Sequence, residues 1–359
     1  MTDTHGSNTA STGYRPGVSP ADVELVLAHT PAAVWEALRG QRLFVSGGTG
    51  FVGCWLLEAL LAGHERFGLG LELTVLTRAP GRFRAKAAHL AGHPAVRLLQ
   101  GDVTDLAGVA GPFDTILHVA TDVVRPDADP LRVYRDIVAG TEQTLALAAR
   151  AGATRYLLTS SGAVYGRQPA DCPQVPESHA GAPATDDLGS AYGQAKRAAE
   201  FLLACHARQH GTAARVARCF ALVGPYMALD AQFAIGNFIR DSLAGAPVRV
   251  GGDGTPLRSY LYAADLAVWL LTILVNGDAQ PYNVGSSRAV SVAELARRVS
   301  RALTGAEHVV VAQAATPGRA PAQYVPATAR AAALGLREYT DLDAAIRATA
   351  AWQPRPAAP

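Results

Sequence analysis

Ser46-Gly47-Gly48-Thr49-Gly50-Phe51-Val52-Gly53 joins two segments of different periodicity and decides the fold. Residues 42–46 before it are β-prone, and residues 51–61 after it carry apolar side chains at helical spacing. Glycines at 47, 50 and 53 allow a tight turn, close approach to a pyrophosphate and close packing of the helix on its sheet. The helix amino end would offer unpaired N–H groups to phosphate. We therefore predict a dinucleotide-binding turn whose cofactor-binding residues are Gly47, Thr49, Gly50, Phe51, Val52 and Gly53.

Strand and helix patterns alternate outward from this turn. Further strands are predicted over residues 73–77, 96–100, 115–119, 156–160 and 214–218, with helical patterns between most of them. Such alternation predicts an α/β fold with a Rossmann-type, doubly wound parallel sheet. After Phe220 the rhythm breaks into shorter helices separated by Gly- and Pro-rich segments, which predicts a smaller carboxyl-terminal substrate-binding lobe.

The same patterns predict how the chain divides. Residues 1–40 are expected to hold a mobile arm to about residue 18, then two helices that begin at Ser19-Pro20 and Thr30-Pro31. Residues 41–222, with about 258–285, are expected to form the dinucleotide-binding Rossmann domain. Residues 223–257 and 286–359 are expected to form the nucleotide-sugar-binding lobe. The apolar run 266–275 is shorter than the ~20 residues that span a bilayer, so it predicts a buried helix.

Composition and charge exclude several classes of protein. Apolar residues make up 49% and charged residues 17%, which excludes a disordered chain or a coiled coil as the main body. Thirty-two basic and 30 acidic residues give a net charge of +2, too small to attract nucleic acid or an anionic membrane. The four cysteines form no CxxC pair, and no apolar leader stands near the start, so we expect a reduced, cytoplasmic location.

The end of the second predicted strand bears on the choice of cofactor. It reads Leu73-Thr74-Val75-Leu76-Thr77-Arg78, so the carboxylate that binds the ribose of NAD is absent. An arginine stands where the 2′-phosphate of NADP would lie. Arg78 therefore favours NADP over NAD, although an Arg78 that stacks on adenine would be compatible with NAD.

Four further motifs are Gly101-Asp102-Val103-Thr104-Asp105, His118-Val119-Ala120-Thr121, Thr159-Ser160-Ser161-Gly162-Ala163-Val164-Tyr165-Gly166 and Tyr192-Gly193-Gln194-Ala195-Lys196. With these, the chain from about Arg42 to Leu336 resembles the extended short-chain dehydrogenases/reductases, specifically the nucleotide-sugar epimerases and dehydratases. The resemblance implies that Asp102 contacts adenine and that the strand end at His118 lies beside the cofactor. The remaining expected cofactor contacts are Val103, Val119, Ala120, Thr121, Tyr192 and Lys196.

Tyr192 and Lys196 are four residues apart and so share one face of a helix. An ammonium near a phenol, together with an oxidised nicotinamide, stabilises phenolate, so a group with a reference pKa of about 10 can act as a base near neutrality. The resemblance implies that Lys196 also holds the nicotinamide ribose and that Ser161 bonds the reacting sugar oxygen. We therefore predict Ser161, Tyr192 and Lys196 as the catalytic residues.

Gly162 and Ala163 depart from part of the family. In the 4,6-dehydratases of the family an Asp-Glu pair stands there and eliminates water, whereas neither of these residues can move a proton. The resemblance then implies an epimerase, which oxidises one carbon, most often C4, and returns the hydride to the opposite face. The alternative is an NADPH-dependent keto-sugar reductase of the same family. A dehydratase, a decarboxylase and a non-catalytic dinucleotide sensor are less favoured.

Residues 252–265, Gly-Asp-Gly-Thr-Pro-Leu-Arg-Ser-Tyr-Leu-Tyr-Ala-Ala-Asp, resemble the family's GDGxxxRDYxxVxD segment. There the arginine grips the nucleotide diphosphate, a role suited to a guanidinium fork, so Arg258 is expected to do so here. Ser259 and Ala221 stand where relatives have Asp and Asn, which leaves the position of the sugar open. The complete substrate-binding prediction is Thr121, Ser161, Gly162, Ala163, Asn237, Arg258 and Arg319.

The resemblance and the histidine spacing also give predictions for the partner subunit, the substrate and a metal site. The resemblance implies a homodimer through the helix of Tyr192 and the helix over about 131–150, and a nucleotide-diphosphate hexose or heptose as substrate. UDP, dTDP, GDP, CDP and ADP all remain open. The i, i+4 pairs His89/His93 and His206/His210 lack a third ligand at suitable spacing, so solvated helix faces are predicted and no metal site.

Overall fold

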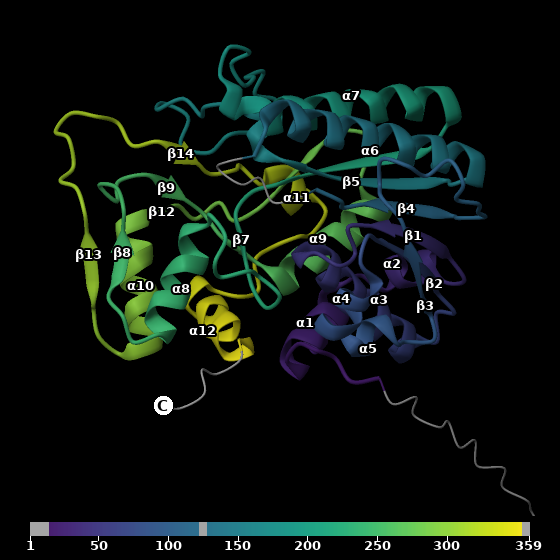
Figure 1. Cartoon of the computed structure of the whole chain (residues 1–359), viewed down its shortest axis with the longest axis horizontal. Helices are drawn as coiled ribbons and strands as arrows, with labels where there is room; N and C mark the ends of the chain where they lie inside the picture. Colours follow the sequence, from purple (N-terminus) through teal and green to yellow (C-terminus); the bar gives the residue numbers. More distant parts are fainter. Residues whose placement is uncertain (1–13, 122–127, 354–359) are drawn as a thin grey trace, which may run out of the picture.

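A parallel sheet forms the centre of the molecule (Figure 1). The computed structural model describes residues 14–121 and 128–353, and in them this sheet has seven strands in the order β3-β2-β1-β4-β5-β6-β11. Every neighbouring pair is parallel, which confirms the doubly wound sheet. The strands are β1 (Arg42–Ser46), β2 (Glu72–Thr77), β3 (Val96–Gln100), β4 (Thr115–His118), β5 (Arg155–Ser161), β6 (Ala213–Cys219) and β11 (Tyr282–Val284).

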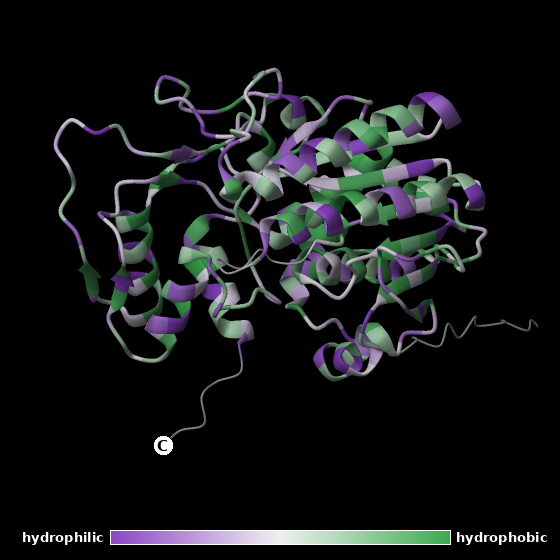
Figure 2. Cartoon of the chain, turned by 45° about the horizontal axis from the view of Figure 1, so that its top comes forward, coloured by the Kyte–Doolittle hydropathy of each residue, from purple (hydrophilic) through white to green (hydrophobic). Residues whose placement is uncertain are grey.

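Helices cover both faces of the sheet (Figure 1). One face packs on α6 (Pro130–Ala151) and α7 (Ala191–His210), and the other on α3 (Phe51–Phe67) and α9 (Ala263–Asn276). On β1, Phe44 belongs to the cluster of the first face, while Leu43 and Val45 belong to that of the second. Successive strand side chains point to opposite faces, so one short strand supplies both cores. Figure 2 shows the hydrophobic residues concentrated along the strands and the inner sides of these helices.

Helix α9 is buried along nearly its whole length, as predicted for residues 266–275. No helix in the described ranges combines the length and apolar character needed to cross a membrane. The expected cytoplasmic location stays a prediction.

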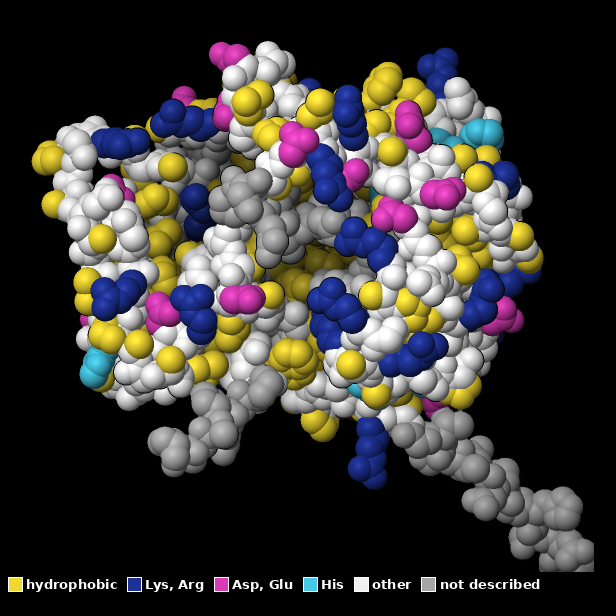
Figure 3. Space-filling model, viewed as in Figure 1, with side chains coloured by type: hydrophobic (Ala, Val, Ile, Leu, Met, Phe, Trp, Pro, Cys, Tyr) yellow, Lys and Arg dark blue, Asp and Glu magenta, His cyan; other side chains and the backbone are white. Residues whose placement is uncertain are grey.

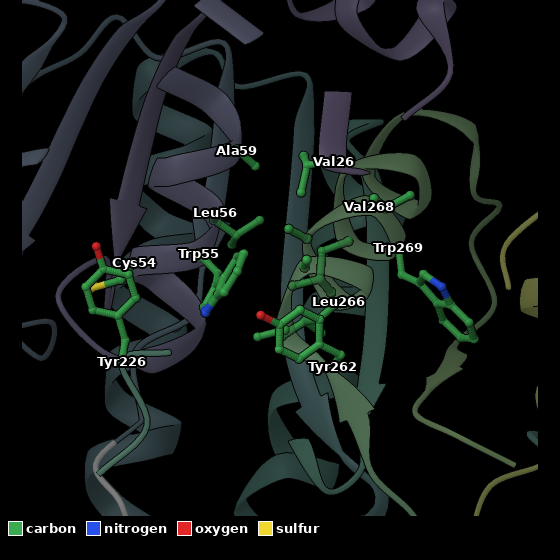
Figure 4. Packing of buried hydrophobic residues seen from close by; sticks show 14 of the residues in the cluster. Val26, Cys54, Trp55, Leu56, Ala59, Tyr226, Tyr262, Leu266, Val268 and Trp269 are labelled. Atoms are coloured by element: carbon green, nitrogen blue, oxygen red, sulfur yellow. The ribbon is translucent and has the colours of Figure 1, made fainter. Parts of the chain in front are cut away.

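Two amino-terminal helices pack against α3 and α9. Helix α1 (Pro20–His29) begins as predicted, because the Ser19 hydroxyl accepts from the Asp22 N–H at 3.1 Å, and α2 (Ala32–Leu38) follows after Pro31. Figure 4 shows Val26 of α1 between Ala59 of α3 and Val268 of α9. The arm expected up to about residue 18 lies, for residues 1–13, outside the described residues.

A buried carboxylate ties the segment before α1 to the body of the fold. Glu58, in the middle of α3, is 2% exposed. Its Oε2 accepts from the Tyr14 hydroxyl at 2.6 Å, and its Oε1 accepts from the Gly17 N–H at 3.0 Å and the Tyr226 hydroxyl at 2.5 Å. A buried charge is tolerated only when it is hydrogen-bonded, so these donors are what allow Glu58 to stand in an apolar cluster.

A second lobe follows β6. It contains the helices α8 (Ala234–Leu243), α10 (Val292–Thr304) and α12 (Leu342–Trp352), and small sheets join its loops. In one of these sheets β9 (Leu257–Arg258) lies between β12 (Val290–Ser291) and β14 (Gln323–Tyr324). Two-stranded pairs are formed by β7 (Leu222–Val223) with β10 (Leu261–Tyr262) and by β8 (Val248–Val250) with β13 (Val309–Val311). The remaining short helices of the described chain are α4 (Pro80–Lys86), α5 (Ala88–Ala91), η1 (Gly162–Tyr165), η2 (Leu188–Ser190) and α11 (Ala329–Ala333).

The spacing of the histidine pairs predicted solvated helix faces, and this prediction is wrong for one histidine of each pair. His93 and His206 are 7% and 6% exposed. His93 Nε2 lies 3.0 Å from a Glu65 carboxylate oxygen, and His206 Nε2 lies 3.2 Å from the Thr212 hydroxyl. Helix α5 ends before His93, so the four-residue spacing no longer describes one helix face there. In the described ranges no three His, Cys, Asp or Glu side chains gather as a metal site.

Tyr14→Phe is expected to lower the free energy of unfolding by about 1–3 kcal/mol, because Glu58 Oε2 then loses its hydrogen bond inside the protein. Urea unfolding followed by tryptophan fluorescence measures the difference. Tyr134→Phe removes a hydroxyl from a side chain that is 37% exposed and serves as the matched control. Equal midpoints for the two variants would contradict a stabilising role for this contact.

Candidate active site

The glycine turn between β1 and α3 tolerates almost no side chain. Gly47 has a φ of 75°, and a Cβ atom there would lie 2.5 Å from the Ala120 nitrogen. A Cβ atom on Gly53 would lie 2.2 Å from the Gly47 carbonyl oxygen. Both contacts are far closer than atoms can approach, so the first and third glycines are required by the fold itself.

The fold itself does not require a glycine at position 50, the middle glycine of the turn. A Cβ atom there would meet only the Gly47 oxygen, at 3.4 Å, and no side chain caps the helix that begins after it. The first N–H groups of α3 are therefore served by no capping side chain, and the backbone in front of them is bare. This arrangement fits the pyrophosphate of a dinucleotide, with residues 51–53 as the donors.

Asp102 and Arg78 lie together at the expected adenosine end of the site. Hydrogen bonds from the Thr104 N–H and hydroxyl to Asp102 Oδ1, at 2.9 and 2.8 Å, hold the pKa of that carboxyl below its usual range, and the Arg78 charge adds to the effect. Lys86, which sequence reasoning missed, donates to the Thr49 carbonyl at 2.9 Å and so adds a cation at the turn. Figure 3 shows Lys and Arg side chains gathered around the hollow between the two lobes.

The three predicted catalytic residues meet at the carboxyl end of the sheet. Ser161 is the last residue of β5 and is 6% exposed, while Tyr192 and Lys196 lie in the first turns of α7. The Ser161 hydroxyl lies near enough to Tyr192 to lower the pKa of the phenol, and Lys196 Nζ lies 5.9 Å from the centre of the Tyr192 ring. Helix α7 can approach this closely because Gly193 faces the Ala163 carbonyl, which a Cβ atom would meet at 2.6 Å.

Lys196 is 2% exposed, and its ammonium is held by two oxygens. Nζ donates to the Thr121 hydroxyl at 2.7 Å and to the Thr159 carbonyl at 2.9 Å. Burial lowers the pKa of Lys196 to about 8, while Cys219 and Glu200 oppose the shift. The structure thus places Thr121, which was predicted to bind cofactor and substrate, on the ammonium of Lys196, and it places that ammonium near the Tyr192 ring.

Burial raises the pKa of Tyr192 to about 12, although its hydrogen bond with Ser161 opposes the shift. This direction is the reverse of what a base needs near neutrality. A further positive charge beside the phenol, in addition to that of Lys196, would therefore favour the phenolate that can accept a proton. An oxidised nicotinamide supplies such a charge when it is bound, in keeping with the predicted pairing of Tyr192 and the cofactor.

Sequence reasoning missed several polar groups around these three. Tyr324 of the second lobe has its hydroxyl 3.4 Å from Ser161 Oγ. Glu200 and Arg218 form an ion pair at 2.7 Å behind the site, and the Ser160 hydroxyl donates to the same carboxylate. Glu200 stands four residues after Lys196 on α7, so its helical spacing was an available signal. Tyr324 is more than 160 residues from Ser161, and no local pattern announces it.

The predicted substrate residues divide into two groups. Ala163 donates its N–H to Ser161 Oγ at 3.1 Å, and Arg258 is paired in register with Tyr324 across β9 and β14, so both belong to the catalytic surroundings. Asn237 instead bonds Arg240 at 2.9 Å in a separate hollow beside α8. Arg319 lies in an exposed loop near Asp253. A role for Asn237 or Arg319 in binding stays a prediction.

Comparisons with known proteins place this site in a family. The profile of the NAD dependent epimerase/dehydratase family matches residues 43–285. UDP-glucuronic acid decarboxylase 3 of Arabidopsis thaliana is 33% identical over 261 residues, which are 72% of this chain and 73% of the relative. A dTDP-glucose 4,6-dehydratase of Streptomyces venezuelae, solved with NAD and TYD bound, is 26% identical with a TM-score of 0.72, covering 87% of this chain and 96% of that one. A UDP-glucose 4-epimerase of Thermotoga maritima, solved with UDP-glucose, has a TM-score of 0.73 at 21% identity over 87% and 98% of the two chains, and supports the fold.

Gly50→Ala is expected to leave folding intact and to weaken dinucleotide binding at least about tenfold, because the methyl group meets only one protein atom but stands where a pyrophosphate would approach. Thermal unfolding and calorimetric titration with NAD and NADP separate the two effects. Gly108→Ala, where a Cβ atom meets nothing within 4 Å, is the control. Equal affinities for the two variants would argue against pyrophosphate binding at this turn.

Lys196 is expected to make stability depend on pH. Because its pKa is lowered on folding, the unfolded chain holds the extra proton between about pH 8 and the ordinary lysine value of about 10. Relative to Lys196→Met, the unfolding free energy of the unmodified chain should rise with pH in that window, by at most about 1.4 kcal/mol per pH unit. It should run parallel to that of the variant below about pH 8. Urea unfolding at several pH values tests this, and parallel curves throughout would contradict the lowered pKa.

Proposed function

The chain belongs to the NAD dependent epimerase/dehydratase family, and from this premise we propose that it is a nucleotide-sugar epimerase that inverts C4 through a transient 4-keto sugar. The expected nicotinamide cofactor agrees with the family's description, which names NAD, and the bound dinucleotide supplies a reversible hydride acceptor. The preference for NADP suggested by Arg78 stays a prediction.

Tyr192 removes the proton from the reacting sugar hydroxyl and gives it back when the ketone is reduced. Ser161 bonds the same oxygen and holds it near the phenol, since the Ser161 hydroxyl is close enough to Tyr192 to act on its pKa. Lys196, buried and held by Thr121 and Thr159, keeps a positive charge next to Tyr192. Tyr192 and Ser161 therefore move and orient one proton at one sugar oxygen, which is what reversible oxidation of a hydroxyl requires.

The choice of an epimerase rests on the two residues that follow Ser161 in the described chain, neither of which carries a carboxylate. Gly162 and Ala163 follow Ser161, and Glu200, the acid described behind it, is engaged by Arg218 and Ser160. Elimination of water from a sugar needs a second acid or base besides Tyr192. Inversion of C4 needs none, because hydride and proton both return to the atoms they left.

A decarboxylase of a nucleotide-linked uronic acid is the second candidate, and the curated relatives favour it. UDP-glucuronic acid decarboxylases of Arabidopsis thaliana are 33% identical to this chain. Oxidation at C4 of a uronic acid gives a β-keto acid, which loses CO2 when the resulting enolate oxygen is stabilised. Ser161 and Tyr192 would stabilise that oxygen with the same contacts, and a proton donor to C5 would complete the reaction.

A homodimer is the proposed assembly. Helices α6 and α7 carry the exposed apolar side chains Leu131, which is 52% exposed, and Phe201, which is 70% exposed. Exposed apolar groups on two adjacent helices are suited to packing against a second copy of the same surface.

Incubation with UDP-glucose, UDP-galactose, UDP-glucuronic acid and their dTDP counterparts, followed by chromatography and mass spectrometry, tests the two candidates. Epimerisation gives a product of unchanged mass, whereas decarboxylation gives a pentose and CO2. Tyr192→Phe is expected to lower the rate at least about a thousandfold, because its ring keeps the packing and loses the proton acceptor. Unchanged turnover in this variant would contradict Tyr192 as the base, and a pentose product would replace the epimerase with the decarboxylase.

A further inference from the structure

Tyr324 reaches the catalytic serine from the other lobe. Its hydroxyl lies 3.4 Å from Ser161 Oγ, and its ring packs on Phe220 with 4.6 Å between the ring centres. Among the described residues, the approach depends on Gly162. A Cβ atom on Gly162 would lie 2.8 Å from the Tyr324 hydroxyl and 2.6 Å from the Phe220 ring. The glycine that stands in place of an acid is thus also the residue that admits this phenol.

The hydroxyl of Ser161 has three neighbours and a limited capacity for hydrogen bonds. It can donate one bond and accept two. The Ala163 N–H donates to it at 3.1 Å, which occupies one acceptor position. Tyr192 and Tyr324 share what is left, namely one donor and one acceptor position.

The two phenols cannot be equivalent when Tyr192 acts as a base. A phenolate on Tyr192 only accepts, so the Ser161 proton must point to it. Tyr324 then has one possible role at Ser161, which is to donate into the remaining acceptor position. The order of donation is therefore Tyr324 to Ser161 to Tyr192, and each bond in such a chain strengthens the next.

We propose that Tyr324 is a positioning residue for catalysis, whose hydroxyl donates to Ser161 and thereby turns the Ser161 proton toward Tyr192 or toward the sugar oxygen that takes its place. This inference rests on the proposed function, because it assumes that Tyr192 is the base. It adds a residue from the second lobe to a catalytic group that otherwise comes from the Rossmann sheet and α7.

The groups that face the two phenols support this direction. Tyr192 is faced by Lys196 from its own helix and by Cys219 from the end of β6, whose pKa burial raises to about 12, so the thiol stays neutral. Glu200 acts on Lys196 from the next turn of α7. Burial raises the pKa of Tyr324, and its hydrogen bond with Ser161 and the charge of Arg258 oppose the shift only in part, so Tyr324 can donate its proton in a hydrogen bond.

The register of β14 on β9 places this contact beside the expected nucleotide site, because Tyr324 is the strand partner of Arg258, the residue predicted to grip the diphosphate.

Tyr324→Phe tests the proposal in the cofactor-loaded protein without any sugar. The measured quantity is the near-ultraviolet phenolate absorbance that is lost in Tyr192→Phe, titrated against pH with NAD bound. The variant keeps the ring on Phe220 and removes only the donor. We expect the Tyr192 titration to move up by about half to one pH unit, because the loss of one hydrogen bond to a polarised chain has that size.

Two further variants keep the test decisive. Gly162→Ala keeps the Tyr324 hydroxyl in the protein, but its methyl group pushes that hydroxyl away from Ser161. This variant should therefore move the Tyr192 titration in the same direction. Tyr156→Phe removes another buried hydroxyl from β5, one that bonds Thr144, and should not move it. An unchanged titration in Tyr324→Phe, or an equal shift in Tyr156→Phe, overturns the proposal.

The failure of the proposed function has a different signature. If no nucleotide sugar is turned over while Tyr324→Phe still moves the Tyr192 titration, the proposed order of hydrogen bonds is supported and the proposed epimerisation is contradicted. Where turnover is found, the acidic limb of the pH profile of kcat should move up with the titration in Tyr324→Phe. A drop in kcat with an unmoved profile would indicate a packing role alone and would reject the proposal.

Discussion

A Cβ atom on Gly53 would lie 2.2 Å from the carbonyl oxygen of Gly47, so α3 can begin where it does only because both positions lack a side chain. This contact sets the helix close on β1 and directs its amino end to the carboxyl edge of the sheet. Strands β5 and β6 end at the same edge, with Ser161 and Cys219 as their last residues, because all these strands are parallel. The cofactor turn and the reacting groups therefore share one side of the molecule for a single geometric reason.

Burial is the second constraint on the site, and it shifts the pKa values of Lys196 and Tyr192 in opposite directions. Removal from water lowers the pKa of Lys196 to about 8 and raises that of Tyr192 to about 12, since in each case it disfavours the charged form. Burial therefore opposes the deprotonated form of Tyr192 that the proposed mechanism needs, and positive charge near the phenol has to offset this effect.

Family membership and site chemistry give different information about the reaction. The likeness to UDP-glucuronic acid decarboxylases extends over 72% of the chain, and the likeness to a 4,6-dehydratase covers 87% of it, so the fold is common to several reactions. What distinguishes them is the set of groups beside Ser161. Among the residues that the structure describes, that set includes Gly162, Ala163 and a tyrosine from the other lobe, and none of these three is a carboxylic acid.

The sequence alone determined the sheet, the glycine turn and the shared helix face of Tyr192 and Lys196, because each depends on local spacing. Ser161 was singled out by the family resemblance, and the catalytic roles of the three residues stay predictions. It was wrong about His93 and His206, since burial depends on which helix packs over them. Tyr324 at Ser161 and Tyr14 at Glu58 were decided only by the tertiary structure. Both contacts join segments far apart in the chain, and no periodicity records which distant side chain will supply a hydrogen bond.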